Sequence, residues 1–135
     1  MKALDTSVLL ALLEGDRSAR ELVRRLREEE LATTELNVLE LVHVLTRGSK
    51  RLRSHRRDAL DRMTRKLTVL PIDSRARSAV RRSAIRGRLG DTLTVTAMAG
   101  ALEAAGCDEL FTGEPGDWGE ISAFKIARFS RHRTK

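Results

Sequence analysis

The sequence has few of the residues that build disulfide frameworks, aromatic binding surfaces and membrane spans. Its one cysteine, Cys107, excludes an internal disulfide and a cysteine-based structural metal site, so we expect a reducing, cytoplasmic setting in which this thiol fills the core. Tyrosine is absent and aromatic residues make up 3% of the chain, so base stacking should be minor. The longest apolar run, Val8 to Leu13, is far shorter than the ~18 residues of a membrane span.

Linkers, repeats and a recognisable targeting signal are also lacking. The apolar stretch behind Lys2 is interrupted by Asp5 and Glu14 and is followed by no small-residue cleavage site, which argues against a secretory signal. No internal repeat, low-complexity tract or Pro- or Gly-rich linker divides the chain. We therefore expect one domain over residues 1–135, long enough to bury roughly 68% of its unfolded surface.

Positive charge is concentrated in the middle of the chain. The formal net charge is +7, but residues 47–88 hold 15 Lys or Arg against 3 acids, whereas both flanking segments are mildly acidic. A basic segment of this kind predicts a surface that faces a polyanion, nucleic acid before membrane, because its helices lack the aromatic face of a membrane-surface helix. The alternative is a solvated, Arg-rich exterior.

Apolar strand patterns alternate with helical patterns along the chain. Strands are expected at residues 2–5, 31–34, 67–73, 109–112 and 124–129, and helices at 6–14, 16–30, 35–47, 55–67, 74–86 and 91–106. This alternation predicts an α/β fold of three layers, with helices on both faces of a central, mostly parallel sheet of four to five strands.

Some finer expectations concern helix starts and burial. The predicted N-caps are Ser18 with Glu21 as its capping-box partner, Thr33 or Thr34, Ser74, and Asp91. Residues 35–47 carry apolar stripes on two sides, so this helix is expected to be sandwiched between other elements. The β-branched segment 67–73 is expected to be a buried strand.

Carboxylates follow the predicted strands at one edge of the sheet. Asp5 ends the first strand, Glu40 lies in the first turns of the helix after the second, and Asp91 opens a later helix, while Glu114 and Asp117 follow the fourth strand. Because the carboxyl ends of parallel strands meet at one edge, these charges would repel one another unless a divalent cation compensated them. Oxygen donors alone favour Mg²⁺ or Mn²⁺ over Zn²⁺.

Each acid also has an ordinary structural interpretation. Asp5 and Asp91 can each be a helix N-cap and nothing more. Glu40 can pair with His43 one turn later, and acids are common in loops such as 113–120. Trp118 is more often a core anchor than a stacking platform. The pattern of acids, rather than any one of them, therefore indicates a metal site.

Four segments together are similar to a known family. In chain order, "LDTSVLLALL", "TTELNVLELVHVL", "LGDTLTVTAMA" and "LFTGEPGDW" resemble the PIN domain, and within it the VapC-like toxins of toxin–antitoxin pairs. The resemblance covers nearly the whole chain. It implies an α/β/α PIN-like fold, Mg²⁺- or Mn²⁺-dependent cleavage of RNA, a homodimer, and inhibition by a cognate VapB-like antitoxin.

The resemblance also assigns positions. Asp5, Glu40 and Asp91 match the family's first three acids, and Thr6 or Ser7 matches the hydroxyl beside the first. The fourth acid departs from the pattern. Where the family usually has Asp or Asn, this chain has Glu114, and Asp117 matches a second, more variable acid, so either can complete the site.

The leading hypothesis is a metal-dependent endoribonuclease that cleaves RNA by metal-activated water, with no covalent intermediate. The RNA backbone would be held by Arg47, Lys50, Arg51, Arg53, Arg56, Arg57, Arg86 and Arg88. Two alternatives remain. One is a PIN-fold RNA-binding or regulatory domain with little turnover. The other is a phosphotransfer domain with Asp5 as nucleophile, which is disfavoured because no lysine occurs between Lys66 and Lys125.

Overall fold

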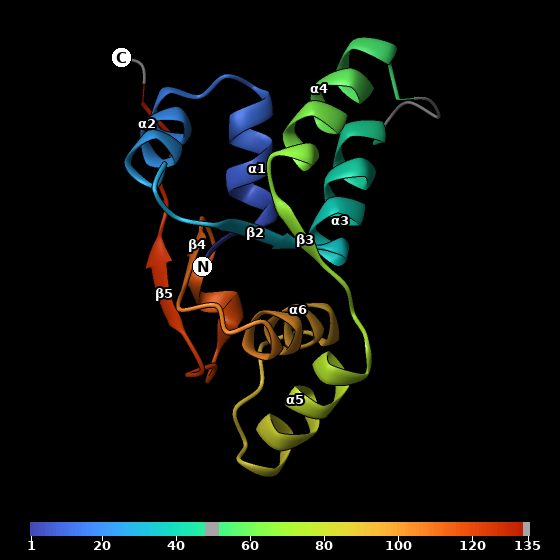
Figure 1. The fold of residues 1–135 in the computed structure, drawn as a ribbon, viewed down its shortest axis with the longest axis vertical. Helices are drawn as coiled ribbons and strands as arrows, with labels where there is room; N and C mark the ends of the chain where they lie inside the picture. The colour runs from blue at the N-terminus through green and yellow to red at the C-terminus, as the bar shows by residue number, and fades with distance from the viewer. Residues whose placement is uncertain (48–51, 134–135) are drawn as a thin grey trace.

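The computed structural model describes residues 1–47 and 52–133, which form a parallel sheet covered by helices (Figure 1). The strands are β1 (Lys2–Leu4), β2 (Leu31–Thr34), β3 (Thr68–Leu70), β4 (Glu109–Thr112) and β5 (Lys125–Arg128). The helices are α1 (Thr6–Leu13), α2 (Arg17–Arg25), α3 (Glu35–Thr46), α4 (Ser54–Arg65), α5 (Ser74–Ile85), α6 (Leu93–Ala104) and the 3₁₀ turn η1 (Pro115–Trp118). None of the helices in the described ranges has the length and apolar character needed to cross a bilayer.

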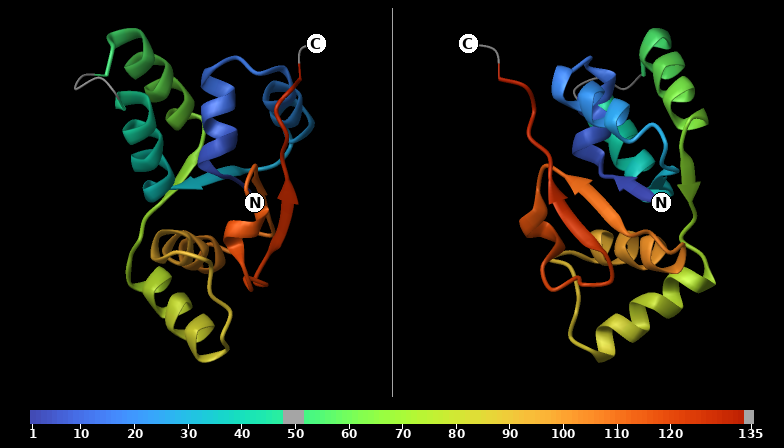
Figure 2. Two further views of the ribbon diagram at one scale, coloured as in Figure 1. Left: turned by 180° about the vertical axis from the view of Figure 1, so that it is seen from behind. Right: turned by 60° about the vertical axis from the view of Figure 1, so that its left-hand side comes forward.

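All five strands are parallel, in the order β3-β2-β1-β4-β5. Helices α1 to α4 lie on one side of the sheet, and α5, α6 and η1 lie on the other (Figures 1 and 2). The predicted three-layer α/β fold with a mostly parallel sheet is therefore confirmed. In such a sheet every strand ends at the same edge, where α1 and α3 begin and where the connections after β3 and β4 start.

Two apolar cores lie on the two sides of the sheet. Because side chains of a strand alternate between faces, Ala3 belongs to the core under α6, whereas Leu4 belongs to the core under α1. The first core also holds Trp118, which is 1% exposed, and the second also holds Leu41 of α3. The sheet edge that carries the predicted acids is thus fixed from both sides.

Three of the predicted helix caps are wrong by one or two residues. The caps are Asp16 for α2, Asp73 for α5 and Thr92 for α6, in place of Ser18, Ser74 and Asp91. Each observed cap accepts a hydrogen bond from a backbone N–H of its first helical turn. Adjacent polar residues compete for the same role, and the preceding connection decides which of them adopts the extended backbone that a cap needs. Thr34 is confirmed as the cap of α3.

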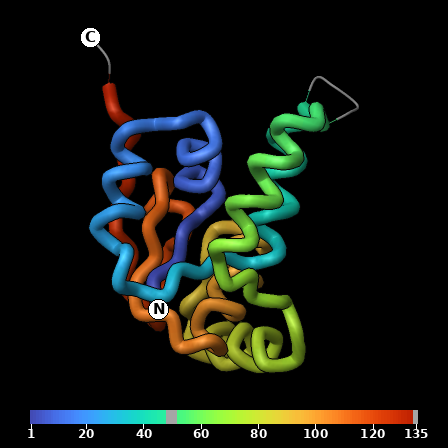
Figure 3. Tube along the Cα trace, turned by 45° about the horizontal axis from the view of Figure 1, so that its top comes forward, coloured from blue at the N-terminus to red at the C-terminus, as the bar shows by residue number. Residues whose placement is uncertain are grey.

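The expected burial of two segments is also wrong. Helix α3 is covered on one side only, since Leu41 is buried while Leu39 is 62% exposed. Figure 3 shows the reason: α3 and α4 project together beyond the sheet as a helical hairpin, here called the α3–α4 hairpin. Strand β3 is an edge strand that pairs, among the described residues, with β2 alone, and Val69 is 39% exposed.

Cys107 is buried, as expected for a thiol that fills the core. Its Sγ lies within hydrogen-bond distance of the carbonyl oxygens of Glu109 (3.3 Å) and Met1 (3.4 Å), which share its one S–H donor. Burial raises the pKa of the Cys107 thiol, which leaves little reactive thiolate.

We expect the folded protein to resist modification of Cys107 by a thiol reagent such as dithionitrobenzoate, whereas the same reagent should modify the urea-unfolded chain at once. Equal rates in both states would show that the β4 end of the sheet opens readily.

Candidate active site

Asp5 is a buried carboxylate at the end of β1 whose described partners are all neutral. Its Oδ1 accepts hydrogen bonds from Thr6 N (2.9 Å) and Asn37 Nδ2 (2.8 Å), and its Oδ2 accepts one from Thr112 Oγ1 (2.6 Å). The residue is 9% exposed and caps α1, so the structural interpretation of Asp5 as a cap is confirmed. Within the described residues no cationic side chain pairs with it. Three donors stabilise this charge without neutralising it.

Thr6 links Asp5 to the second predicted acid. Its Oγ1 donates to Glu40 Oε1 (2.8 Å), while its backbone N–H donates to Asp5. Glu40 itself is exposed on α3, and its described hydrogen bond is to Thr6 rather than to His43. Two carboxylates from separate segments therefore share one threonine at the sheet edge.

Asn37 completes this link and was missed by the sequence reasoning. Its amide oxygen accepts from Thr34 of the α3 capping box, which leaves Nδ2 to donate to Asp5 (2.8 Å) and to Thr6 Oγ1 (3.1 Å). The side chain is 3% exposed. The available signal was its spacing: an amide three residues after a capping threonine and three before Glu40 lies on the same helix face as that acid.

The loop after β4 is docked onto the start of α1. Gly113 N donates to Ser7 Oγ (2.8 Å), and Glu114 N donates to Thr112 Oγ1 (3.0 Å). Ser7 thus holds the loop backbone, and Thr6 is the hydroxyl that contacts an acid. The side chain of Glu114 is exposed at this edge.

Asp91 and Asp117 are joined through their backbones. Asp91 is exposed in the connection between α5 and α6, and its N–H donates to the carbonyl oxygen of Asp117 (2.9 Å). Its Oδ1 faces Gly119, where an added Cβ would lie 3.2 Å away. The Asp91 side chain therefore lies against the turn that follows η1.

The described hydrogen bonds link Asp5 with Glu40 through Thr6, and Asp91 with Asp117 through the backbone. In residues 1–47 and 52–133, no three Asp, Glu, His or Cys side chains come together in an arrangement that would hold a metal ion. The donor set nevertheless fits a hard divalent cation, because it consists of carboxylate and hydroxyl oxygens and includes the uncompensated charge of Asp5. The ligand role of each acid stays a prediction.

The predicted RNA-binding residues occupy two separate surfaces. Those that the structure describes are all exposed: Arg47, Arg53, Arg56, Arg57, Arg86 and Arg88. Lys50 and Arg51 lie outside the described residues. The first four belong to the far end of the α3–α4 hairpin, whereas the last two follow α5 at the opposite end of the molecule (Figure 1). The predicted RNA-binding residues therefore do not form one continuous surface in the part of the chain that the structure describes.

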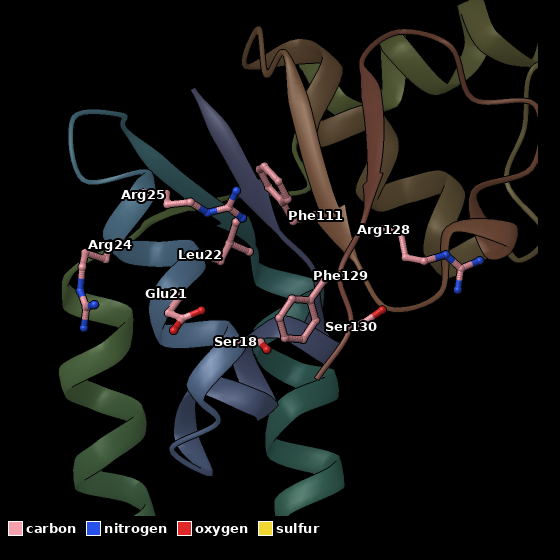
Figure 4. A pocket seen from close by; sticks show the side chains of 9 residues that line it. All are labelled: Ser18, Glu21, Leu22, Arg24, Arg25, Phe111, Arg128, Phe129 and Ser130. Atoms are coloured by element: carbon pink, nitrogen blue, oxygen red, sulfur yellow. The ribbon is translucent and has the colours of Figure 1, made fainter. Parts of the chain in front are cut away.

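A pocket of about 450 Å³ lies between α2 and the ends of β4 and β5, apart from the acids (Figure 4). Arg25 extends toward Phe111, while Arg24 and Arg128 point outward. The lining residues are Ser18, Glu21, Leu22, Arg24, Arg25, Phe111, Arg128, Phe129 and Ser130. No predicted site residue is among them, so the candidate active site is the carboxylate edge of the sheet.

Solved structures with a similar fold come from toxin–antitoxin complexes. The crystal structure of VapBC2 from Rickettsia felis bound to a DNA fragment from their promoter matches with a TM-score of 0.78 and 14% identity, covering 96% of this chain and 98% of that one. DNA-bound VapBC from Salmonella typhimurium gives 0.74 and 17%, covering 94% and 96%. VapBC-5 from Mycobacterium tuberculosis, a member of the VapBC family of toxin–antitoxin systems, gives 0.62 and 21%, covering 95% and 98%. At these identities the likeness concerns the fold.

Sequence comparison identifies the family directly. No curated protein sequence matches the chain. The family model described as the PIN domain matches residues 2–111, a range that contains Asp5, Glu40 and Asp91 and runs from β1 to β4. This match shows that the chain belongs to the PIN domain family, and the all-parallel sheet with acids at its edge agrees with it.

Proposed function

We propose that this PIN domain is a VapC-like toxin, an endoribonuclease that depends on Mg²⁺ or Mn²⁺. The observation that carries the proposal is the buried Asp5 carboxylate, which has three neutral donors, no cationic partner in the described residues, and a link through Thr6 to Glu40. Such an arrangement has no evident structural benefit beyond the helix cap, because a neutral residue can cap α1 without a buried charge.

Asp5, Glu40 and Asp91 would hold the ion, and Glu114 or Asp117 would complete the site. The bound ion would polarise a phosphodiester oxygen and make a bound water a better nucleophile. The chain's own hydrogen bonds do the positioning: Asn37 and Thr112 orient the two oxygens of Asp5, and Thr6 orients Glu40. Fixed side chains of this kind reduce the reorganisation needed on reaching the transition state.

RNA is the substrate that we propose, on the strength of the basic α3–α4 hairpin. The exposed Arg53, Arg56 and Arg57 begin α4, and the predicted contacts Lys50 and Arg51 precede them in the sequence. Guanidinium groups bind phosphate oxygens, so affinity should fall steeply with salt. Base stacking should contribute little, since the chain has only three Phe and one Trp.

The partners are also part of the proposal. The similar structures named above are VapBC complexes, which supports a VapB-like antitoxin as the natural inhibitor. We also propose that the protein is a homodimer and acts in the cytoplasm.

The test is cleavage of labelled RNA by the purified chain with Mg²⁺, Mn²⁺ or EDTA. We expect chelation to abolish cleavage and excess Mg²⁺ to restore it. Binding without cleavage at any metal concentration would favour a PIN-fold RNA-binding domain instead. Acyl-phosphate formed with a phosphate donor would favour the Asp5 phosphotransfer domain. Cleavage that survives EDTA would contradict the proposed metal chemistry.

A further inference from the structure

The connection that carries Asp91 is joined to the turn after η1 by two backbone hydrogen bonds. Asp91 N donates to Asp117 O (2.9 Å), and Glu120 N donates to Leu89 O (3.3 Å). These bonds place residues 89–91 alongside residues 117–120. The backbone position of Asp91 is therefore set by a segment almost 30 positions further along the chain.

Gly119 lies at the closest point of this contact. Its backbone has φ +50° and ψ −122°, a conformation that a side chain strongly disfavours. A Cβ there would lie 2.9 Å from Leu89 O and 3.2 Å from Asp91 Oδ1. The first distance is shorter than real Cβ contacts, so any side chain would strain this backbone contact. At the second distance, Asp91 Oδ1 would have to give way by a few tenths of an ångström.

Both sides of the contact are anchored to the same layer of the fold. Trp118, beside Gly119, is 1% exposed and meets Phe124 edge to face, with ring centroids 6.1 Å apart. On the other side, Gly90 N donates to Thr96 Oγ1 of α6 (3.2 Å). A shift of either segment would disturb the core under α6, so an added atom at Gly119 would strain the backbone contact with Leu89 and press on the exposed Asp91 side chain.

We propose that Gly119 is a positioning residue for the Asp91 carboxylate and thereby sets the affinity of the site for its divalent cation. The inference rests on the proposed function, in which Asp91 is a ligand. Gly119 touches neither metal nor substrate in this scheme. It acts by leaving the space in which Asp91 Oδ1 lies.

The test is a titration of the 135-residue chain with Mn²⁺ in the absence of RNA. Electron paramagnetic resonance measures the free ion and thus the dissociation constant. Gly119→Ala is expected to weaken Mn²⁺ binding at least about tenfold, within the range for residues that orient metal ligands. Two control variants are expected to bind as wild type. Gly87→Ala has a similar positive φ (+68°) with nothing within 4 Å, and Gly116→Ala lies in η1, also with open space.

A double-mutant cycle separates positioning from general damage. In an Asp91→Ala background, Gly119→Ala should cause no further loss of Mn²⁺ affinity, since its effect passes through Asp91. Wild-type binding by Gly119→Ala, together with weak binding by Asp91→Ala, would overturn the inference and leave the proposed function intact. Wild-type binding by Asp91→Ala would instead overturn the metal role of Asp91, and the inference with it.

If Gly119→Ala fails to fold, Asp91→Glu tests the step on which the inference depends, the position of the carboxylate. The longer side chain keeps the charge and carries its carboxylate one methylene further from the backbone. It is expected to weaken Mn²⁺ binding about tenfold. Wild-type affinity in that variant would overturn the inference, because it would show that the position of the carboxylate does not matter.

Discussion

Glu40→Gln is expected to reduce RNA cleavage by more than about 100-fold while changing the free energy of unfolding by no more than about 0.5 kcal/mol. Glu40 is exposed, and its described hydrogen bond is the one that it accepts from Thr6 Oγ1. The glutamine carbonyl oxygen can accept the same bond, so the fold loses nothing. The negative charge is lost, and with it a ligand of the proposed ion. Single-turnover cleavage and urea unfolding together measure the two quantities.

Glu21→Gln is the matched control. Glu21 is also an exposed helical glutamate, but it lies on α2 and pairs with Arg17 (3.2 Å). Such exposed pairs are worth little, so both stability and cleavage should stay near wild type. Wild-type cleavage by Glu40→Gln would remove Glu40 from the site. A large loss of stability would instead show that Glu40 holds α3 in place.

Asn37→Asp is expected to destabilise the protein by roughly 3 kcal/mol or more at pH 7. The substitution replaces the Nδ2 donor that reaches Asp5 (2.8 Å) and Thr6 (3.1 Å) with an anionic oxygen, so two carboxylates would face each other in a buried setting. The capping bond from Thr34 can persist, because it uses the other oxygen. Urea unfolding at pH 7 measures the loss.

The same variant should show a characteristic pH dependence. Repulsion raises the pKa of the new carboxyl in the folded state above its unfolded value of about 4. Protonation then relieves the repulsion, so the deficit relative to wild type should shrink as the pH falls to about 4 and grow as the pH rises through the folded pKa. Asn37→Ala, which removes the same donor without adding a charge, should show a smaller deficit that varies less with pH. Parallel curves for both variants would contradict the arrangement around Asp5.

The layers of the fold were predictable from sequence because strand and helix patterns are local. "KALD", "LATT" and "ELFT" read as short strands between amphipathic helices, and the structure places β1, β2 and β4 there. The order of strands is not local. β3 has the composition of a buried strand, yet it lies at the edge because β2 and not β3 pairs with β1. Likewise, the sequence of α3 has two apolar sides and does not indicate which of them the rest of the chain will cover.

The acids of the candidate site were predictable as types and only partly as neighbours. Asp5 and Glu40 were expected at one sheet edge, and they meet there through Thr6. Asp91 was expected as a helix cap beside them, but Thr92 competes for that role, and the backbone bond to Asp117 draws Asp91 toward the turn after η1. Helix-cap preferences could not decide between Asp91 as a cap and Asp91 bonded to Asp117, because the bond to Asp117 is a contact distant in sequence.

The central place of β1 in the sheet has a consequence for protein synthesis. The hydrogen bond between Asp5 and Thr112 joins residues 107 positions apart, and β1 obtains its second neighbour only when β4 has been made. A nascent or prematurely terminated chain that stops before Thr112 therefore lacks the one described hydrogen bond to Asp5 Oδ2. Such distant pairing also slows folding. Under the proposed function, the candidate site would therefore be complete only after the segment through Thr112 has been synthesised and paired with β1.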